Sequence, residues 1–280
     1  MSNVMKIEKR NTILRHLVEG NSIRSTCRLM GSQIHTVLRQ LEWAGKHCEA
    51  LLNDRLQGVR CRHLEVDEIW TWCARKQANL TIEERALRHD IGDLYLFTAQ
   101  DQDSRLIVHH LLGKRSADNT RRFMVQLADN LAQPDGGYGC PQISVDGFPA
   151  YPEAVDLAFG RDCKLGVIIK EYRNSRLQYD PSEIVGTKRK RMRGAIEDRS
   201  ICTSHVERNN LTIRTFMKRF CRLTMGFSRK IENLEAAVNL HMCYFNFCWR
   251  PGTMKVTPAQ AAGIADHCWT FDKLLAEQTA

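Results

Sequence analysis

Three acidic residues, far apart in the chain, lie in sequence surroundings that suit metal-dependent chemistry. Asp67 lies inside the apolar stretch HLEVDEIWTWC, and Asp146 directly follows the apolar run ISV. Glu207 lies at the start of a strongly basic segment, SHVERNN. An unpaired carboxylate inside an apolar strand is costly, which favours metal binding for Asp67. Asp146 is expected at the carboxyl end of a strand, where α/β sheets gather their ligands.

Such a trio could catalyse the cleavage of a phosphodiester. That reaction needs an activated water or hydroxyl in line with the leaving oxygen, while negative charge builds up around phosphorus. Two metal ions roughly 3.5–4 Å apart meet both demands. Mg²⁺ prefers oxygen ligands and keeps several waters, so a few carboxylates suffice. We therefore expect Asp67, Asp146 and Glu207 to be catalytic and to bind two Mg²⁺ ions, for which Mn²⁺ can substitute.

Each of the three acids also has a purely structural explanation. Asp67 could be a paired structural charge, and Asp146 with Gly147 is a common turn signal. Glu207 fits a helix capping box with Ser204 as the N-cap residue. These alternatives stay open for each residue taken singly.

Two further groups near these acids compete for a role. Glu65 precedes Asp67 by two residues and is expected on the same face of the strand, whereas Glu68 faces the other side. Glu65 could be an auxiliary metal ligand or even a primary one. His205 could orient a metal-bound water, although packing or phosphate contact is the favoured role.

The helix expected after Glu207 places polar groups along one side. Asn210, Arg214 and Lys218 follow at steps of three and four, so we expect them on roughly the face of Glu207, where they would contact DNA phosphates. The opposite side carries an apolar stripe that is typical of a buried face: Val206, Ile213, Phe216, Met217 and Phe220.

The charge of the chain points to a polyanionic partner. The formal net charge is +9. Residues 170–222 hold 14 Lys and Arg against 6 Asp and Glu, and residues 1–60 hold 10 against 5. This concentration favours nucleic acid, although basic residues can also merely solubilise a surface. The densest cluster is expected to bind DNA and consists of Lys188, Arg189, Lys190 and Arg191.

The elements around the acids divide the chain into three sections. Residues 1–60 are helical in pattern, with a glycine turn at Gly31 and Ser32 as the expected cap of a third helix, and they resemble a helix-turn-helix DNA-binding module. The third helix would present its polar residues to bases or phosphates. The residues concerned are Gln33, His35, Thr36 and Arg39. A plain three-helix bundle is the alternative.

Residues 61–225 alternate between strand-like and helix-like stretches. Three strands joined by a hairpin turn, followed by β-α units, predict a mixed α/β sheet with flanking helices. The strands expected are 63–73, 94–99, 105–111, 143–145 and 165–169, and the helices are 119–132 and 149–159. Residues 171–200 are expected to form a long loop, and a loop of that length is usually functional. Residues 226–280 are expected to form a C-terminal helical segment that packs on the catalytic domain.

The sequence also bears on the cellular location of the protein and on the state of its cysteines. The chain has no apolar run long enough for a membrane span and no secretory signal at its start, so a cytoplasmic, nucleoid-associated protein is expected. Its 11 cysteines are scattered and contain no C-x-x-C pair, which favours free thiols over disulfides or zinc sites.

Several of these segments together resemble the DDE transposases of the insertion sequence one family. The matching segments are HLEVDEIW at 63–70, SVDGF at 144–148, SHVERNNL at 204–211, NFC at 246–248 and VTPAQAAG at 256–263. The resemblance covers about residues 61–265, in order. Family members often carry an N-terminal zinc-binding segment, and no such cysteine cluster occurs in this chain. The N-terminal DNA-binding role is therefore supported only in outline.

The resemblance implies a ribonuclease-H-like catalytic fold, with Asp67 and Asp146 on strands and Glu207 on a helix. It also implies Mg²⁺ dependence, binding to terminal inverted repeats, and cleavage and joining of DNA. Because two DNA ends must be handled together, a dimer or larger assembly is expected. Two rival functions stay open. One is a DNA-binding regulator derived from a transposase without catalysis, and the other is a ribonuclease-H-like nuclease that does not join strands.

Overall fold

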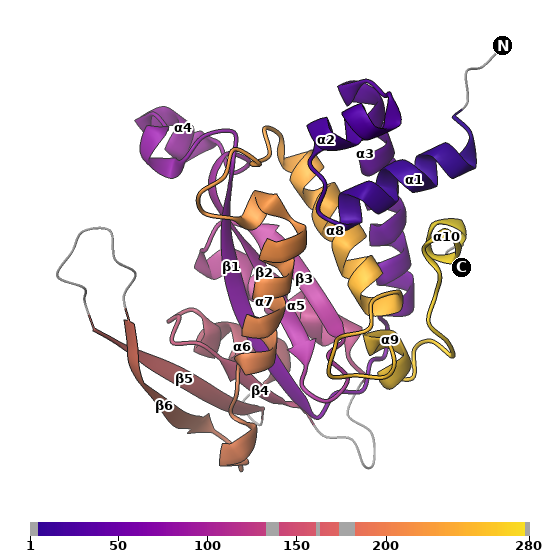
Figure 1. Ribbon diagram of the computed structural model, residues 1–280. Coiled ribbons are helices and arrows are strands. Elements are labelled where there is room, and N and C mark those ends of the chain that lie inside the picture. The colour runs from indigo at the N-terminus through magenta and orange to yellow at the C-terminus, as the bar shows by residue number, and fades with distance from the viewer. Residues whose placement is uncertain (1–4, 133–139, 161–162, 174–182, 278–280) are drawn as a thin grey trace.

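A six-stranded mixed sheet forms the centre of the molecule. The computed structural model describes residues 5–132, 140–160, 163–173 and 183–277. The strands follow the spatial order β3-β2-β1-β4-β5-β6 (Figure 1). Their bounds are β1 His63–Cys73, β2 Gly92–Asp101, β3 Ile107–Gly113, β4 Gln142–Val145, β5 Lys164–Arg173 and β6 Glu183–Arg193.

Both strand directions occur in this sheet. Strands β1, β2 and β3 are antiparallel neighbours, and β4 and β5 run parallel to β1. The mixed α/β class is confirmed, and the order of three antiparallel strands followed by β-α units is the one that the sequence predicted. The predicted bounds of β1 agree with the structure at both ends.

The predicted loop at 171–200 is wrong for most of its described residues. Strand β5 continues to Arg173, and β6 pairs with it antiparallel from Glu183 to Arg193. The basic run Lys188–Arg191 therefore lies on an edge strand. A strand with this many charges shows no apolar alternation, so the sequence favoured a loop. Lys and Arg are nevertheless common on edge strands because they discourage pairing with other chains.

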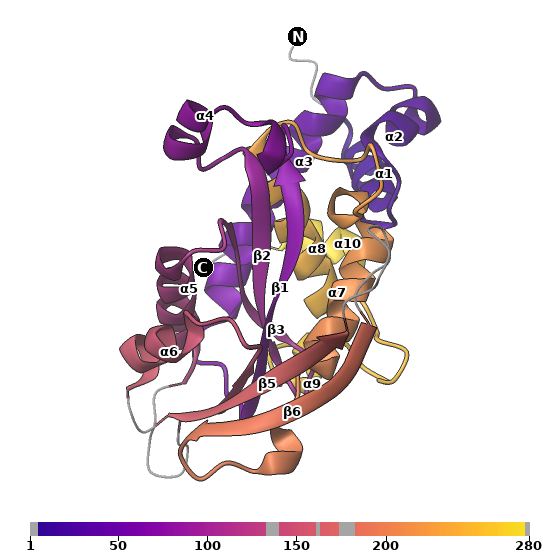
Figure 2. The ribbon, with the colours of Figure 1, turned by 90° about the vertical axis from the view of Figure 1, so that its left-hand side faces the viewer.

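Helices cover both faces of the sheet (Figure 2). Helices α5 (Ala117–Asn130) and α6 (Tyr151–Phe159) lie on one face. Helices α7 (Ser204–Phe216) and α8 (Ile231–Phe247) lie on the other. The short elements are α4 Ile82–Leu87, α9 Pro258–Ala261, α10 Phe271–Ala276 and the 3-10 helices Gln77–Asn79, Asp198–Ser200 and Lys218–Phe220.

Three helices precede the sheet, as the sequence predicted. They are α1 (Ile7–Val18), α2 (Ile23–Met30) and α3 (Ile34–Arg55). Ser22 caps α2, and Gly31 takes the left-handed conformation that turns the chain into α3. The predicted cap Ser32 is wrong: Gln33 holds the N-cap position, and the Ser32 hydroxyl donates to the carbonyl of Met30.

The N-terminal and C-terminal helices join the central sheet in one hydrophobic core. Helix α3 packs along α8, and a Cβ added to Gly45 would lie only 2.4 Å from the Cα of Ala236. Only glycine allows this approach of the two helices. The buried core extends without a break from Leu14 to Leu275. The division of the chain at residues 60 and 225 stays a prediction.

Two predictions about the whole chain concern membranes and thiols. Among the residues that the structure describes, no helix combines the length and the apolar character that crossing a bilayer requires. All 11 cysteines are free thiols in the structure.

Candidate active site

The register of two parallel strands brings Asp67 and Asp146 together. In the β1–β4 ladder His63 pairs with Gln142 and Glu65 with Ser144, a constant offset of 79 residues. The same offset separates Asp67 from Asp146, which directly follows the last residue of β4. The ladder ends at Glu65, so the side of β1 next to Asp67 is open to the residues that follow β4.

A third acid, Glu68, belongs to the same group. Ligand oxygens of Asp67, Glu68 and Asp146 all lie within 4.8 Å of one another. Burial and the charge of Asp146 raise the pKa of Asp67 to about 7. The same two causes raise the pKa of Glu68 to about 8. A cluster of carboxylates that resist ionisation together is stabilised by divalent cations.

Strand alternation predicts Glu68 on the opposite side of β1 from Asp67, and its carboxylate nevertheless lies in this cluster. Its side chain is only 2% exposed, and Arg115 links it to Asp146 with nitrogen–oxygen distances of 3.4 and 3.3 Å. The Arg115 guanidinium also stacks on the ring of Phe148 at 4.1 Å. The fully buried Tyr151 lies nearby, where burial and the charge of Glu68 raise the pKa of its hydroxyl.

Helix α7 supplies the other side of the site. The Asn210 amide donates to Oδ2 of Asp67 over 2.8 Å. Glu207 accepts from the Thr203 hydroxyl at 2.6 Å and forms an ion pair with Lys170 at 2.7 Å. Among the described residues, Glu207 is outside the group of acids within 4.8 Å of one another. Its charge nevertheless contributes to the raised pKa of Asp67.

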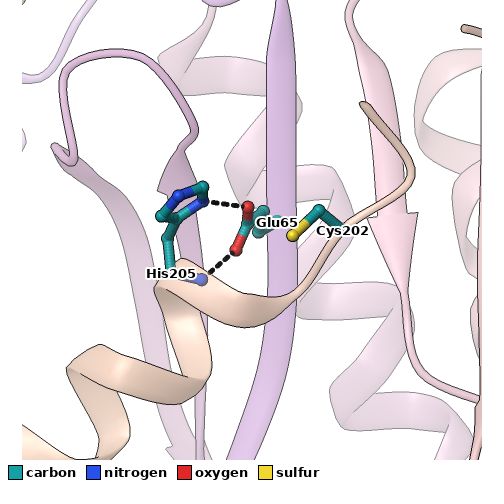
Figure 3. Close-up of side chains that lie close together, drawn as sticks. All are labelled: Glu65, Cys202 and His205. Atoms are coloured by element: carbon teal, nitrogen blue, oxygen red, sulfur yellow. Dashed lines mark hydrogen bonds and ion pairs between the residues drawn. The ribbon is translucent and has the colours of Figure 1, made fainter. Parts of the chain in front are cut away.

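The capping box proposed for Ser204 and Glu207 does not form. Helix α7 begins at Ser204 with Thr203 as its N-cap residue. A distant carboxylate caps the helix instead: Oε2 of Glu65 accepts from the backbone N–H groups of His205 and Val206 at 2.8 and 3.0 Å. Glu65 is fully buried, and its Oε1 lies 2.5 Å from Nδ1 of His205 (Figure 3).

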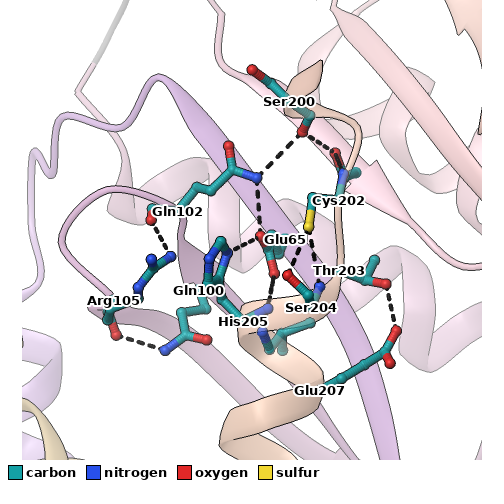
Figure 4. A network of polar contacts seen from close by, with 12 residues as sticks. Glu65, Gln100, Gln102, Arg105, Ser200, Cys202, Thr203, Ser204, His205 and Glu207 are labelled. Carbon is teal, nitrogen blue, oxygen red and sulfur yellow. Dashed lines mark hydrogen bonds and ion pairs between the residues drawn. The ribbon is translucent and has the colours of Figure 1, made fainter. Parts of the chain in front are cut away.

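A network of polar contacts surrounds this cap. The Gln102 amide donates to Oε1 of Glu65 at 3.0 Å, and the Ser200 carbonyl lies 3.4 Å from the same nitrogen. Figure 4 shows the contact between Thr203 and Glu207 beside this network, at the start of α7. The residue that holds Glu207 thus directly precedes the helix that Glu65 caps.

The basic cluster on β6 is divided between two faces of the sheet. Arg189 pairs with Ile168 and Arg191 with Gly166. These partners share the face of Lys170, which contacts Glu207 of α7. Lys188 and Lys190 face the other side, where Lys188 forms an ion pair with Glu171 at 2.5 Å. Arg191 also has a partner, Asp198. Arg189 thus lies on the face of β5 and β6 that carries Lys170, the partner of Glu207.

The other residues predicted to contact DNA lie at two places. Gln33, His35 and Arg39 are exposed at the start of α3, and Thr36 is half-buried there. On α7, Asn210 is only 5% exposed and directs its amide to Asp67, while Arg214 is half-buried. Lys218 does not continue the α7 face as expected, because the helix ends at Phe216 and Lys218 begins a 3-10 helix.

Comparison with known families and with curated protein sequences finds no match. Solved structures with some likeness to this chain include transposases. The Mos1 transposase paired-end complex with the left transposon end has 13% identity and a TM-score of 0.22, over 56% of this chain and 59% of that chain. The Mos1 strand transfer complex has 16% identity and a TM-score of 0.21, over 55% and 57%. This chain spans about three fifths of the Mos1 chains.

A third structure covers more of the molecule. The piggyBac transposase synaptic complex with hairpin DNA has 10% identity and a TM-score of 0.39, over 99% of this chain and 72% of that chain.

The donor atoms at this site suit a hard divalent cation. Carboxylate oxygens of Asp67, Glu68 and Asp146 converge, and this is the ligand type that Mg²⁺ and Mn²⁺ prefer. The sequence did not indicate Glu68, Arg115 or Lys170 as parts of this site. Strand alternation predicts Glu68 on the face of β1 opposite Asp67, and so did not indicate it as a ligand. Arg115 and Lys170 stand in stretches that carry no motif.

Proposed function

We propose that this chain is a DDE transposase of a bacterial insertion sequence, which cleaves DNA at terminal inverted repeats and joins the ends to a target. The observation that carries the proposal is the convergence of Asp67 and Asp146 at one register of β1 and β4, with Glu68 beside them. The resemblance of the sequence to the insertion sequence one family supports the same assignment.

Asp67 and Asp146 would hold divalent metal ions, with Glu207 from α7 as the third catalytic acid and Glu68 as an additional one. Two Mg²⁺ ions, when bound, supply activation of the nucleophile and stabilisation of the leaving oxygen. The protein residues orient the acids. Asn210 holds Asp67, Arg115 holds Asp146 and Glu68, and Lys170 with Thr203 holds Glu207.

DNA would approach the face of the sheet that carries α7. Arg189 lies on that face, and Arg214 adds positive charge near Asp67. Phosphate contacts of this kind position the backbone but read no sequence. Sequence recognition would come from the exposed residues at the start of α3, namely Gln33, His35 and Arg39, which would dock on the inverted repeats as a helix-turn-helix. Because two ends must be handled together, we expect a dimer or larger assembly acting on DNA in the cytoplasm, at the nucleoid.

A strand-joining assay separates this function from its rivals. Pre-cut end DNA, carrying the inverted repeats that flank the gene, is incubated with a plasmid target and Mg²⁺. A transposase yields joined products, which gel electrophoresis detects. Parallel reactions contain an RNA–DNA hybrid or uncut end DNA. A ribonuclease-H-like nuclease would degrade the hybrid and join no ends, and a regulator would bind end DNA without cutting or joining it. Either of those two results would overturn the proposal.

A further inference from the structure

A second group of metal-binding side chains lies where α7 begins. Ligand atoms of Glu65, Cys202 and His205 all lie within 4.8 Å of one another. Figure 3 shows the thiol of Cys202 and the ring of His205 both pointing at the Glu65 carboxylate. The group joins β1 to the start of α7 and to Cys202, which precedes this helix. Neither the proposed catalysis nor the proposed DNA binding uses it.

The three donors differ in kind from those of the active site. A thiolate, an imidazole and a carboxylate form a mixed sulfur, nitrogen and oxygen set. Zn²⁺ binds all three, whereas Mg²⁺ and Ca²⁺ prefer oxygen alone. A site with three protein ligands leaves one tetrahedral position for water.

The local structure favours ligation by each of these side chains. The Ser204 backbone N–H points at Sγ of Cys202 over 3.3 Å, so the start of α7 offers this sulfur a hydrogen-bond donor. The His205 side chain is 32% exposed, so its ring has room to move by the fraction of an ångström that an inserted ion requires. Nδ1 and Oε1, now 2.5 Å apart, face each other.

Glu65 can accept a metal ion without losing its role as a helix cap. Its Oε2 receives the two backbone N–H groups of α7, and its Oε1 receives Gln102 and faces His205. If a cation binds Oε1, the Gln102 amide can still donate a hydrogen bond to the Ser200 carbonyl, which lies 3.4 Å from its Nε2. The cap and the metal site thus use different oxygens of one carboxylate.

We propose that Glu65, Cys202 and His205 bind a Zn²⁺ ion that links β1 to the start of α7. Binding releases the thiol proton to solvent and leaves the imidazole proton on Nε2, so that Nδ1 becomes the ligand. The ion stabilises the turn that precedes Glu207 and does not take part in phosphodiester chemistry. The inference stands apart from the proposed function, because it needs no DNA and no Mg²⁺.

Titration of the metal-free full-length chain with Co²⁺ tests the site directly. Co²⁺ replaces Zn²⁺ in such sites and gives a ligand-to-metal absorption band when a thiolate binds it. We expect a saturable band with a single equivalent of Co²⁺, abolished by added Zn²⁺. The Cys202→Ser variant should lose the band and bind Zn²⁺ at least about 100-fold more weakly, since loss of an outer-sphere partner alone costs about 10–100-fold.

Matched variants decide between this site and other thiols. Cys221→Ser removes another half-buried thiol, outside the cluster, and should keep the band. His205→Ala should weaken Co²⁺ binding without unfolding the chain, because the helix cap uses the backbone and not the ring. Zn²⁺ should raise the urea midpoint of the wild type but not of Cys202→Ser.

The proposal is overturned if the wild type gives no thiolate band, or if the band survives in Cys202→Ser. Either result would leave Glu65 as a helix cap alone. The Asp146→Asn variant should give the same Co²⁺ band as the wild type. Failure of the DNA-cleaving function and failure of the zinc site are therefore separate results.

Discussion

The Asn210 amide of α7 donates to the Asp67 carboxylate of β1 over 2.8 Å, so the helix and the strand meet at the proposed metal site. This bond fixes one oxygen of a carboxylate whose pKa burial and Asp146 raise to about 7. Asn210 is 5% exposed, and its amide has little freedom to move away.

Replacing Asn210 with alanine should weaken metal-dependent cleavage. We expect Asn210→Ala to lose about 10–100-fold in activity, because groups that orient a metal ligand contribute on that scale. The loss should be partly recovered at higher Mg²⁺ concentration, which a Mg²⁺ titration of end cleavage measures. Thr212→Ala on the same helix is the control, since its hydroxyl only bonds the Arg208 carbonyl. An unchanged Mg²⁺ requirement in Asn210→Ala would contradict this role.

Glu65 should matter to stability even without any metal. Its fully buried carboxylate receives two backbone N–H groups of α7 and the Gln102 amide. Glu65→Ala leaves these donors unpaired, and we expect a loss of about 3 kcal/mol in the free energy of unfolding. Urea denaturation in the presence of a chelator measures it. Glu197→Ala, whose side chain is 75% exposed, should change little. Equal midpoints for the two variants would refute the capping role.

The two faces of β6 should contribute unequally to DNA binding. Arg189→Gln and Lys190→Gln each remove one charge from neighbouring positions, but only Arg189 lies on the face of α7. We expect Arg189→Gln to reduce the slope of log binding constant against log salt by about 0.9, the value of one lost phosphate contact. Lys190→Gln should leave the slope unchanged. Filter binding at several salt concentrations measures both. Equal slopes for the two variants would mean that DNA does not distinguish the faces.

Acid should destabilise the fold through a buried histidine in α8. Burial lowers the pKa of His241 from 6.5 to about 4. The unfolded chain therefore binds a proton more readily than the folded one. The stability is fully present above pH 6.5 and is lost as the pH falls towards about 4. The expected loss is roughly 3 kcal/mol, at about 1.4 kcal/mol for each pKa unit.

Replacing His241 with phenylalanine tests this linkage. Urea midpoints at pH 7 and pH 5 should differ less in His241→Phe than in the wild type, because the variant has no group to protonate at that position. His35→Phe, on the exposed start of α3, is the control and should keep the wild-type difference. If His241→Phe shows the full acid sensitivity, other groups must account for it.

The sequence predicted those parts of the fold that apolar patterns specify. The stretch HLEVDEIWTWC gave the bounds of β1 because apolar and β-branched residues run through it between polar flanks. The offset of 79 residues between Asp67 and Asp146 was visible in the sequence. Only the pairing of β1 with β4 shows that this offset places the two acids side by side, because a pairing register depends on contacts between distant segments.

The parts that could not be predicted depend on long-range charge contacts. Glu68 joins the acids because Arg115, 47 residues away, links it to Asp146. Lys170 meets Glu207 only once β5 lies beside α7. Strand β6 could not be predicted because an exposed edge strand carries no apolar alternation, and its charges are as typical of a loop.

The Asp146→Asn variant tests most directly whether Asp67 and Asp146 bind the metal ions that cleave DNA. Mg²⁺-dependent cleavage of end DNA is measured beside binding of the same DNA. We expect cleavage to fall to background while binding persists, because the change removes a ligand without altering size. Asp118→Asn, an exposed acid on α5, should cleave normally. Cleavage by Asp146→Asn at the wild-type rate would contradict the account.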